Sequence, residues 1–156
     1  MHFSASMTAV GRPEQLYSWW SDYTDGVIAD SSFTKVERRI VSREGNSIVM
    51  DDVFSRPLRF VDRVVVTLLP PDGIVFHSDS RVWKVDGRYS FIRKGDLTEA
   101  TVHADIHPQG IWRIAFALPF VKKMIGREFR EDLKGHLEQF EADSSVAGHG
   151  GGRGGS

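Results

Sequence analysis

Three charged residues, Arg38, Asp52 and Asp62, fall at positions of predicted strands where the alternating neighbours are apolar. Val36 and Ile40 flank Arg38 in this way, so the even positions of that strand are predicted to face inward. An interior charge is costly unless it is paired, and two carboxylates beside one cation favour a raised pKa on one of them. A carboxyl group with a raised pKa can act as a general acid or base. Asp52 and Asp62 are therefore the candidate catalytic residues.

The turn signals predict that these three residues form a row across adjacent strands. If Gly45 lies at the centre of the first hairpin, Arg38 is opposite Asp52. If Pro57 lies at the centre of the next hairpin, Asp52 is opposite Asp62. A second interpretation stays open, in which Arg38 and Asp52 form a structural ion pair and Asp62 lies near a hydrated edge. A register error of one residue would turn all three side chains outward.

The middle of the chain is predicted to be a continuous antiparallel meander. Turn residues around Gly45, Pro57, Pro70 to Gly73 and Gly95-Asp96 divide it into hairpins. The strands are expected near residues 33–43, 47–55, 58–69, 74–80, 82–94 and 97–107. A short first strand, near residues 3–7, precedes them.

Two helices are expected to bracket these strands. Pro13 is suited to the first turn of a helix, and apolar residues then recur on one face at Leu16, Trp19, Trp20 and Tyr23. After the last strand, an amphipathic helix is predicted from near Ile111 to near Ala142. Pro119 should kink that helix or separate its first segment. Both helices must pack on the strands to bury their apolar faces.

Strand alternation also predicts which side chains line the interior. Ser78 and Tyr89 have inward parity and offer hydroxyl groups, although both also fit simple core packing. Small residues in the last strand leave room for a helix or a ligand. The predicted ligand-binding residues are Arg38, Met50, Asp52, Asp62, Val64, Phe76, Ser78, Trp83, Tyr89, Phe91, Val102, Ala104, Val121 and Ile125.

The first strand, the segment Arg12-Pro13-Glu14-Gln15-Leu16-Tyr17, the many-stranded middle and the long last helix resemble the START/Bet v 1-like superfamily. This superfamily, also called SRPBCC, includes polyketide cyclase/dehydratase-like and coenzyme Q-binding branches. The resemblance covers residues 1 to about 143. It implies an α+β helix-grip fold, in which a seven-stranded curved antiparallel sheet wraps around the C-terminal helix. One or two short helices follow the first strand, and an apolar cavity lies between sheet and helix.

Composition excludes several other classes of protein. The 156 residues fit one domain at 1–143 and a disordered, glycine-rich tail at 144–156. The net charge of −1 offers no general attraction to nucleic acid, and the lack of cysteine excludes disulfides and cysteine-based zinc sites. His103 and His107 share a strand face but lie too far apart for one metal ion, so neither a metal nor a cofactor is expected. Serine-hydrolase, P-loop and dinucleotide-binding motifs are absent.

The leading hypothesis is a carrier or sensor that binds a small hydrophobic molecule in the internal cavity. A lipid, an isoprenoid or quinone, or an aromatic polyketide-like compound would fit. One alternative is a polyketide cyclase/dehydratase-like enzyme in which Asp52 or Asp62 moves a proton and Arg38 stabilises an enolate. Another is a protein-interaction module with a filled core. Without a signal peptide or a transmembrane segment, a cytoplasmic location is expected, and a transient contact with a membrane stays open.

Overall fold

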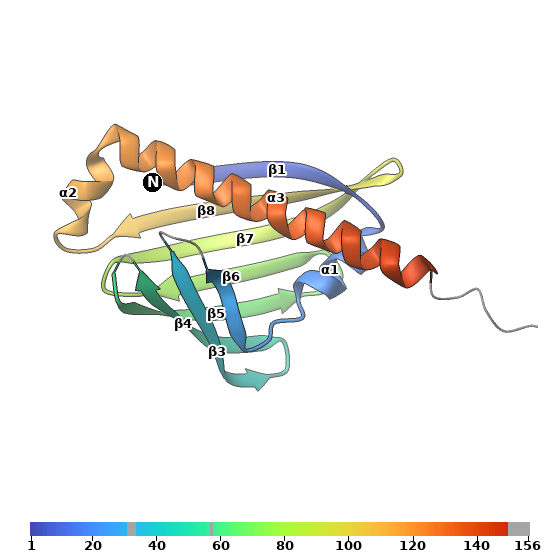
Figure 1. The fold of residues 1–156 in the computed structure, drawn as a ribbon, viewed down its shortest axis with the longest axis horizontal. Helices are drawn as coiled ribbons and strands as arrows, with labels where there is room; N and C mark the ends of the chain where they lie inside the picture. The colour runs from blue at the N-terminus through green and yellow to red at the C-terminus, as the bar shows by residue number, and fades with distance from the viewer. Residues whose placement is uncertain (31–33, 57, 150–156) are drawn as a thin grey trace, which may run out of the picture.

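The computed structural model describes residues 1–30, 34–56 and 58–149. Within these ranges the chain forms one antiparallel sheet of eight strands and three helices (Figure 1). The strands are β1 (His2–Val10), β2 (Gly26–Asp30), β3 (Lys35–Glu44), β4 (Ser47–Arg56), β5 (Phe60–Leu69), β6 (Gly73–Asp79), β7 (Trp83–Lys94) and β8 (Leu97–Pro108). Their order in the sheet is β1-β8-β7-β6-β5-β4-β3-β2. The α+β helix-grip architecture predicted from the sequence is confirmed.

The expectation of seven strands was wrong by one, because β2 adds an edge strand beside β3. The first helix, α1 (Pro13–Trp20), ends before Tyr23 instead of including it. Gly26 then takes a positive φ of 141°, a conformation that other residues rarely adopt, and begins β2 opposite Arg38. The segment between the helix and β3 therefore pairs with the sheet.

The expected break at Pro119 separates two helices, α2 (Trp112–Ala117) and α3 (Pro119–His149). Leu118 between them has an extended backbone, as the residue before a proline prefers. Helix α3 continues to His149, past the expected end near Ala142. Residues 144–149 of the expected tail are therefore helical. Residues 150–156 of that tail lie outside the described residues. None of the described helices is long and apolar enough to cross a membrane.

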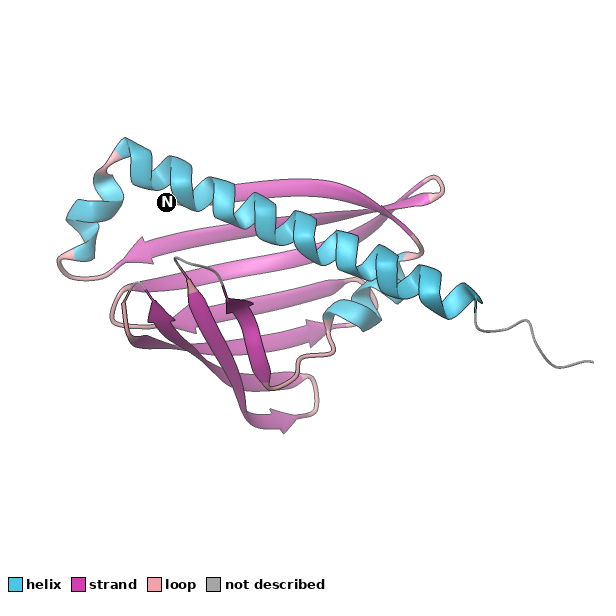
Figure 2. Cartoon of the chain, in the orientation of Figure 1, coloured by secondary structure: helices cyan, strands magenta, loops and turns pink. Residues whose placement is uncertain are grey.

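Strand alternation places the predicted side chains inside. In β8 the four inward residues Ala100, Val102, Ala104 and Ile106 are all buried. Figure 2 shows α3 running across the sheet, with α2 beyond one end and α1 near the other. Each end has its own hydrophobic core. The first cluster joins α1 and the later part of α3 to the sheet, and the second joins α2 and the start of α3 to it.

Candidate functional site

The structure contains the predicted row of charged residues. The register places Arg38 of β3 opposite Asp52 of β4, and Asp52 opposite Asp62 of β5. Arg38 donates two hydrogen bonds to Asp52, from Nε to Oδ1 at 2.8 Å and from Nη2 to Oδ2 at 2.7 Å. Both side chains are largely buried. This bidentate geometry fixes both groups and holds Asp52 beside a positive charge.

The Arg38 guanidinium also lies over an aromatic ring. Its central carbon is 5.3 Å from the centre of the Tyr23 ring, within cation–π range. Burial raises the pKa of Tyr23 to about 12, so its hydroxyl stays neutral. Sequence reasoning missed this residue, because its spacing from Leu16 and Trp20 assigned it to the first helix. The signal that points to it is its place just before Gly26, which pairs with Arg38.

Asp62 has a different environment at the other end of the row. It is 6% exposed, and its Oδ2 accepts a hydrogen bond of 2.9 Å from Trp83 Nε1. Burial raises its pKa to about 6, while the hydrogen bond from Trp83 lowers it and the charge of Asp52 raises it further. A carboxyl group of this kind exchanges its proton near neutral pH.

Two buried oxygen atoms, one of this carboxyl and one of a serine, lack a hydrogen-bond partner among the described residues. They are Oδ1 of Asp62 and Oγ of Ser78. The Ser78 hydroxyl is near enough to Asp62 to lower the pKa of that carboxyl, although the geometry between the two groups falls outside that of a regular hydrogen bond. Buried polar atoms are nearly always paired, so these two atoms make this end of the row the candidate position for a polar group of a ligand.

The remaining predicted residues divide between the two hydrophobic clusters. Met50, Val64, Phe91 and Val102 belong to the first, and Tyr89 packs against it. Ala104 belongs to the second, where Trp83, Val121 and Ile125 pack at its edge. Phe76 contacts both clusters.

The charged row therefore links the two clusters: Arg38 meets Tyr23 of the first, and Asp62 meets Trp83 of the second. Several inward side chains near the row remain half-exposed, among them Phe76, Trp83 and Tyr89. No contact that the structure describes joins Val121 or Ile125 of α3 to the charged row.

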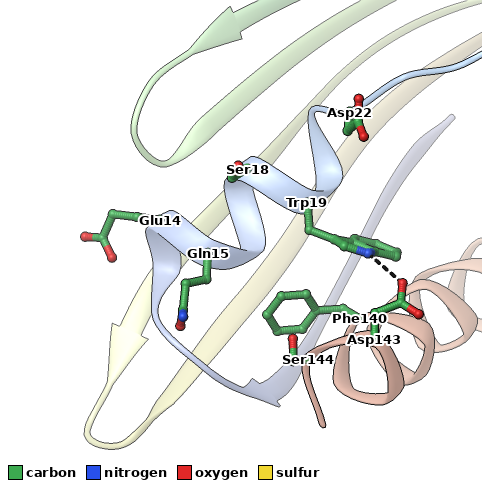
Figure 3. Close-up of a pocket in the computed structure, with 8 residues that line it drawn as sticks. All are labelled: Glu14, Gln15, Ser18, Trp19, Asp22, Phe140, Asp143 and Ser144. Carbon is green, nitrogen blue, oxygen red and sulfur yellow. Dashed lines mark hydrogen bonds between the residues drawn. The ribbon is translucent and has the colours of Figure 1, made fainter. Parts of the chain in front are cut away.

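Two pockets lie at the surface, away from the row, and neither of them is the predicted cavity between the sheet and the helix. The larger, of about 560 Å³, is an open groove between α1 and the end of α3 (Figure 3). In it the Trp19 indole points at Asp143 and donates a hydrogen bond of 3.0 Å to its Oδ2. The smaller, of about 390 Å³, lies between the start of β1, the end of β8 and α2. No group of three or more potential metal ligands gathers among the described residues.

Comparison with solved structures identifies proteins of similar architecture. Protein TTHA0849 from Thermus thermophilus is 18% identical, with a TM-score of 0.74 over 92% of this chain and 99% of that chain. Zhui aromatase/cyclase from Streptomyces sp. R1128 is 8% identical, with a TM-score of 0.69 over 97% of this chain and 98% of that chain. A START superfamily protein from Mycobacterium smegmatis is 18% identical, with a TM-score of 0.62 over 88% of this chain and 97% of that chain. Neither a protein-family model nor a curated protein matches the sequence.

Proposed function

We propose that this protein, which has the START/Bet v 1-like helix-grip fold, binds a small, largely apolar molecule with one hydroxyl group against the concave face of its sheet. The observation that carries the proposal is the pair of unpartnered, buried oxygen atoms on Asp62 and Ser78. A ligand hydroxyl can donate to Asp62 Oδ1 and accept from Ser78 Oγ, so one group satisfies both atoms. Leaving such atoms unpaired costs free energy that ligand binding recovers.

The apolar part of the ligand would lie against the half-exposed aromatic side chains beside the row. Phe76 and Tyr89 pack together with ring centres 5.3 Å apart, and Trp83 lies on the other side, at the second cluster. Such surfaces supply most of the affinity in small-molecule sites, while a few polar groups fix orientation. Aromatic polyketide-like compounds, isoprenoid alcohols and reduced quinones share this combination of features.

Arg38 has a supporting role in this proposal. Because two of its nitrogen atoms bind Asp52, it is committed to that carboxylate and is not a preformed anchor for a ligand anion. The polar contact passes instead to the other end of the row, at Asp62 and Ser78. Asp52, at the centre of the row, contributes in turn to the raised pKa of Asp62.

An enzyme of the polyketide cyclase/dehydratase kind is the second candidate, and Asp62 is the observation that favours it. Its pKa of about 6 and its unpartnered oxygen suit a group that takes or gives a proton near neutral pH. Asp52, clamped by Arg38, is less suited to that role. Asp62→Asn would then abolish turnover of an aromatic polyketide-like substrate while the fold is retained. The third hypothesis, an interaction module with a filled core, predicts that no small molecule binds the concave face.

Native mass spectrometry of protein purified from its own host tests the binding proposal. The expected result is a retained apolar compound that carries a hydroxyl group. A parallel measurement compares the melting temperature with 2-naphthol, farnesol and oleic acid, since a ligand that binds the folded state raises it. Naphthalene, which lacks the hydroxyl, is the matched control for 2-naphthol. No retained compound and no rise with any of these probes would remove the support for a binding function.

A further inference from the structure

The corner where α2 meets α3 exposes an unusual amount of apolar surface. Within fourteen residues, five large apolar side chains are exposed: Ile111 (77%), Ile114 (75%), Leu118 (43%), Phe120 (67%) and Met124 (46%). Figure 1 shows α2 at one end of the molecule, away from α1. Clustered apolar side chains of this size normally mark a surface that contacts a partner.

The same segment is strongly basic. Residues 111–127 contain Arg113, Lys122, Lys123 and Arg127 and no acidic residue. The whole chain has 20 basic and 21 acidic residues, so outside this segment acidic residues outnumber basic ones by 21 to 16. Arg127 Nε lies 3.7 Å from Glu131 Oε1 and forms an ion pair with it. In the part of the chain that the structure describes, Lys122 and Lys123 have no such ion pair. The apolar surface is therefore bordered by positive charge on a chain that is otherwise acidic.

A pocket beside this corner has the same character. Arg113 and Lys122 both line the 390 Å³ pocket between β1, β8 and α2, together with His107. In the part of the chain that the structure describes, no acidic side chain lines it. A cationic pocket next to exposed isoleucine and phenylalanine side chains has the chemistry to accept an anionic headgroup while the apolar side chains enter the acyl region.

We infer that the α2–α3 corner docks on the surface of an anionic lipid bilayer. Ile111, Ile114, Leu118, Phe120 and Met124 enter the outer part of the acyl layer, and the basic residues contact phosphate groups. A second copy of this chain is a poorer occupant, because a twofold contact would bring the same four basic residues against each other. Lipid phosphate complements both the charge and the apolar surface.

This docking surface connects to the concave face through aromatic contacts. Phe116 of α2 lies against Trp83, with ring centres 6.1 Å apart, and Trp83 donates its hydrogen bond to Asp62. Val121 and Ile125 of α3 pack in the same cluster. An apolar molecule that leaves a bilayer at this corner would therefore meet the end of the charged row first. Docking of the corner on a bilayer does not require that a molecule follows this route.

Flotation of the full-length protein with lipid vesicles tests the inference. Vesicles of phosphatidylcholine with about 30% phosphatidylglycerol should bind the protein, and pure phosphatidylcholine should bind it at least about tenfold less. Ile114→Ser/Phe120→Ser and Lys122→Gln/Lys123→Gln should each weaken binding to the anionic vesicles about tenfold or more. Salt at about 0.5 M should weaken it as well.

The matched control is Val10→Ser/Ile92→Ser, which removes two exposed apolar side chains from the opposite end of the sheet. It should bind vesicles as the unaltered protein does. No binding to anionic vesicles, or equal binding by the corner variants, would overturn the inference. A dimer in light scattering that Ile114→Ser/Phe120→Ser disrupts, without any vesicle binding, would assign the corner to a second copy instead. Since Ile114 and Phe120 are exposed, circular dichroism should show these variants folded.

Discussion

The Trp83 indole donates a hydrogen bond of 2.9 Å to Oδ2 of Asp62, and the other oxygen of the same carboxyl has no partner among the described residues. The two oxygen atoms are therefore not equivalent. One is held in place from β7, and the other is buried without a partner among the described residues. A carboxyl group that is positioned but not saturated is suited to bind a hydroxyl or to move a proton, and both proposed functions depend on it.

The raised pKa of Asp62 predicts a pH-dependent cost in stability. The folded protein holds this proton up to a pH of about 6, whereas the unfolded chain releases it near 4, so this group lowers the free energy of unfolding as pH rises between these values. Asp62→Asn removes the effect. The difference in free energy of unfolding, variant minus unaltered protein, should increase by about 1–3 kcal/mol between pH ~4.5 and ~8. Urea unfolding at both pH values measures it, and a constant or decreasing difference would contradict the assigned pKa.

The hydrogen bond from Trp83 should hold that pKa down. Trp83→Phe keeps a ring but removes the N–H, so the carboxylate of Asp62 loses a donor and its pKa should rise above about 6. The carboxyl carbon resonance of Asp62, followed by NMR as a function of pH, reports the value directly. An unchanged or lower pKa in the variant would show that the indole does not stabilise the anion.

The inward and outward ion pairs of β4 should differ in energy. Arg38 and Arg63 both make bidentate contacts, to Asp52 and Asp51, but Arg63 is on the exposed face. Arg38→Met leaves Asp52 unpaired in a largely buried site and should cost about 2–4 kcal/mol of unfolding free energy. Arg63→Met should cost less than about 1 kcal/mol.

A double-mutant cycle separates the pair energy from general damage. In Arg38→Met/Asp52→Asn no unpaired charge remains, so the double variant should be more stable than the sum of the single changes predicts. Chemical denaturation of the four proteins provides the values. Strict additivity, or equal costs for the inward and outward arginine variants, would show that the row is not energetically distinct from the surface.

Gly87 is predicted to be intolerant of a side chain. A Cβ atom there would lie 2.1 Å from Cζ of Phe76, which packs directly over the strand. Gly87→Ala should therefore displace Phe76 and cost about 1–3 kcal/mol of unfolding free energy. Adding Phe76→Leu should recover part of that loss, because the smaller side chain leaves room for the methyl group. A neutral Gly87→Ala would mean that the ring moves away without cost.

Counting residues outward from the hairpin centres predicted the pairing of Arg38 with Asp52. The assumption that Gly45 lies at the centre of the first hairpin was wrong. The turn has two residues, Gly45 and Asn46, so Glu44 pairs with Ser47. Continued regularly, that register would place Arg38 opposite Val53. An irregularity between Ile40 and Ser42 shifts the pairing by one residue and restores the predicted partner. Alternation of apolar residues therefore determined the inward faces correctly, while the bulge was not visible in the turn residues.

Other parts of the site depend on contacts that no local pattern encodes. The alternation placed Trp83 inward, but its hydrogen bond to Asp62 arises only from the packing of β5, β6 and β7. Tyr23 was assigned to the helix because its spacing continues the apolar face. The helix ends at Trp20 instead, because the following residues pair with β3 as strand β2. Tertiary pairing at the sheet edge outweighs helical periodicity there.

Titration of the ¹⁵N-labelled protein with 2-naphthol tests whether Asp62 and Ser78 bind a ligand hydroxyl. We expect shifts in the Trp83 indole N–H and in the backbone amides of Asp62 and Ser78, and weaker shifts with naphthalene. Ser78→Ala should reduce the affinity for 2-naphthol about 3- to 10-fold, as the loss of one hydrogen bond implies. Unchanged signals at these three residues would contradict binding at this end of the row. Shifts only at Trp19 and the other residues of the groove between α1 and α3 would contradict it as well.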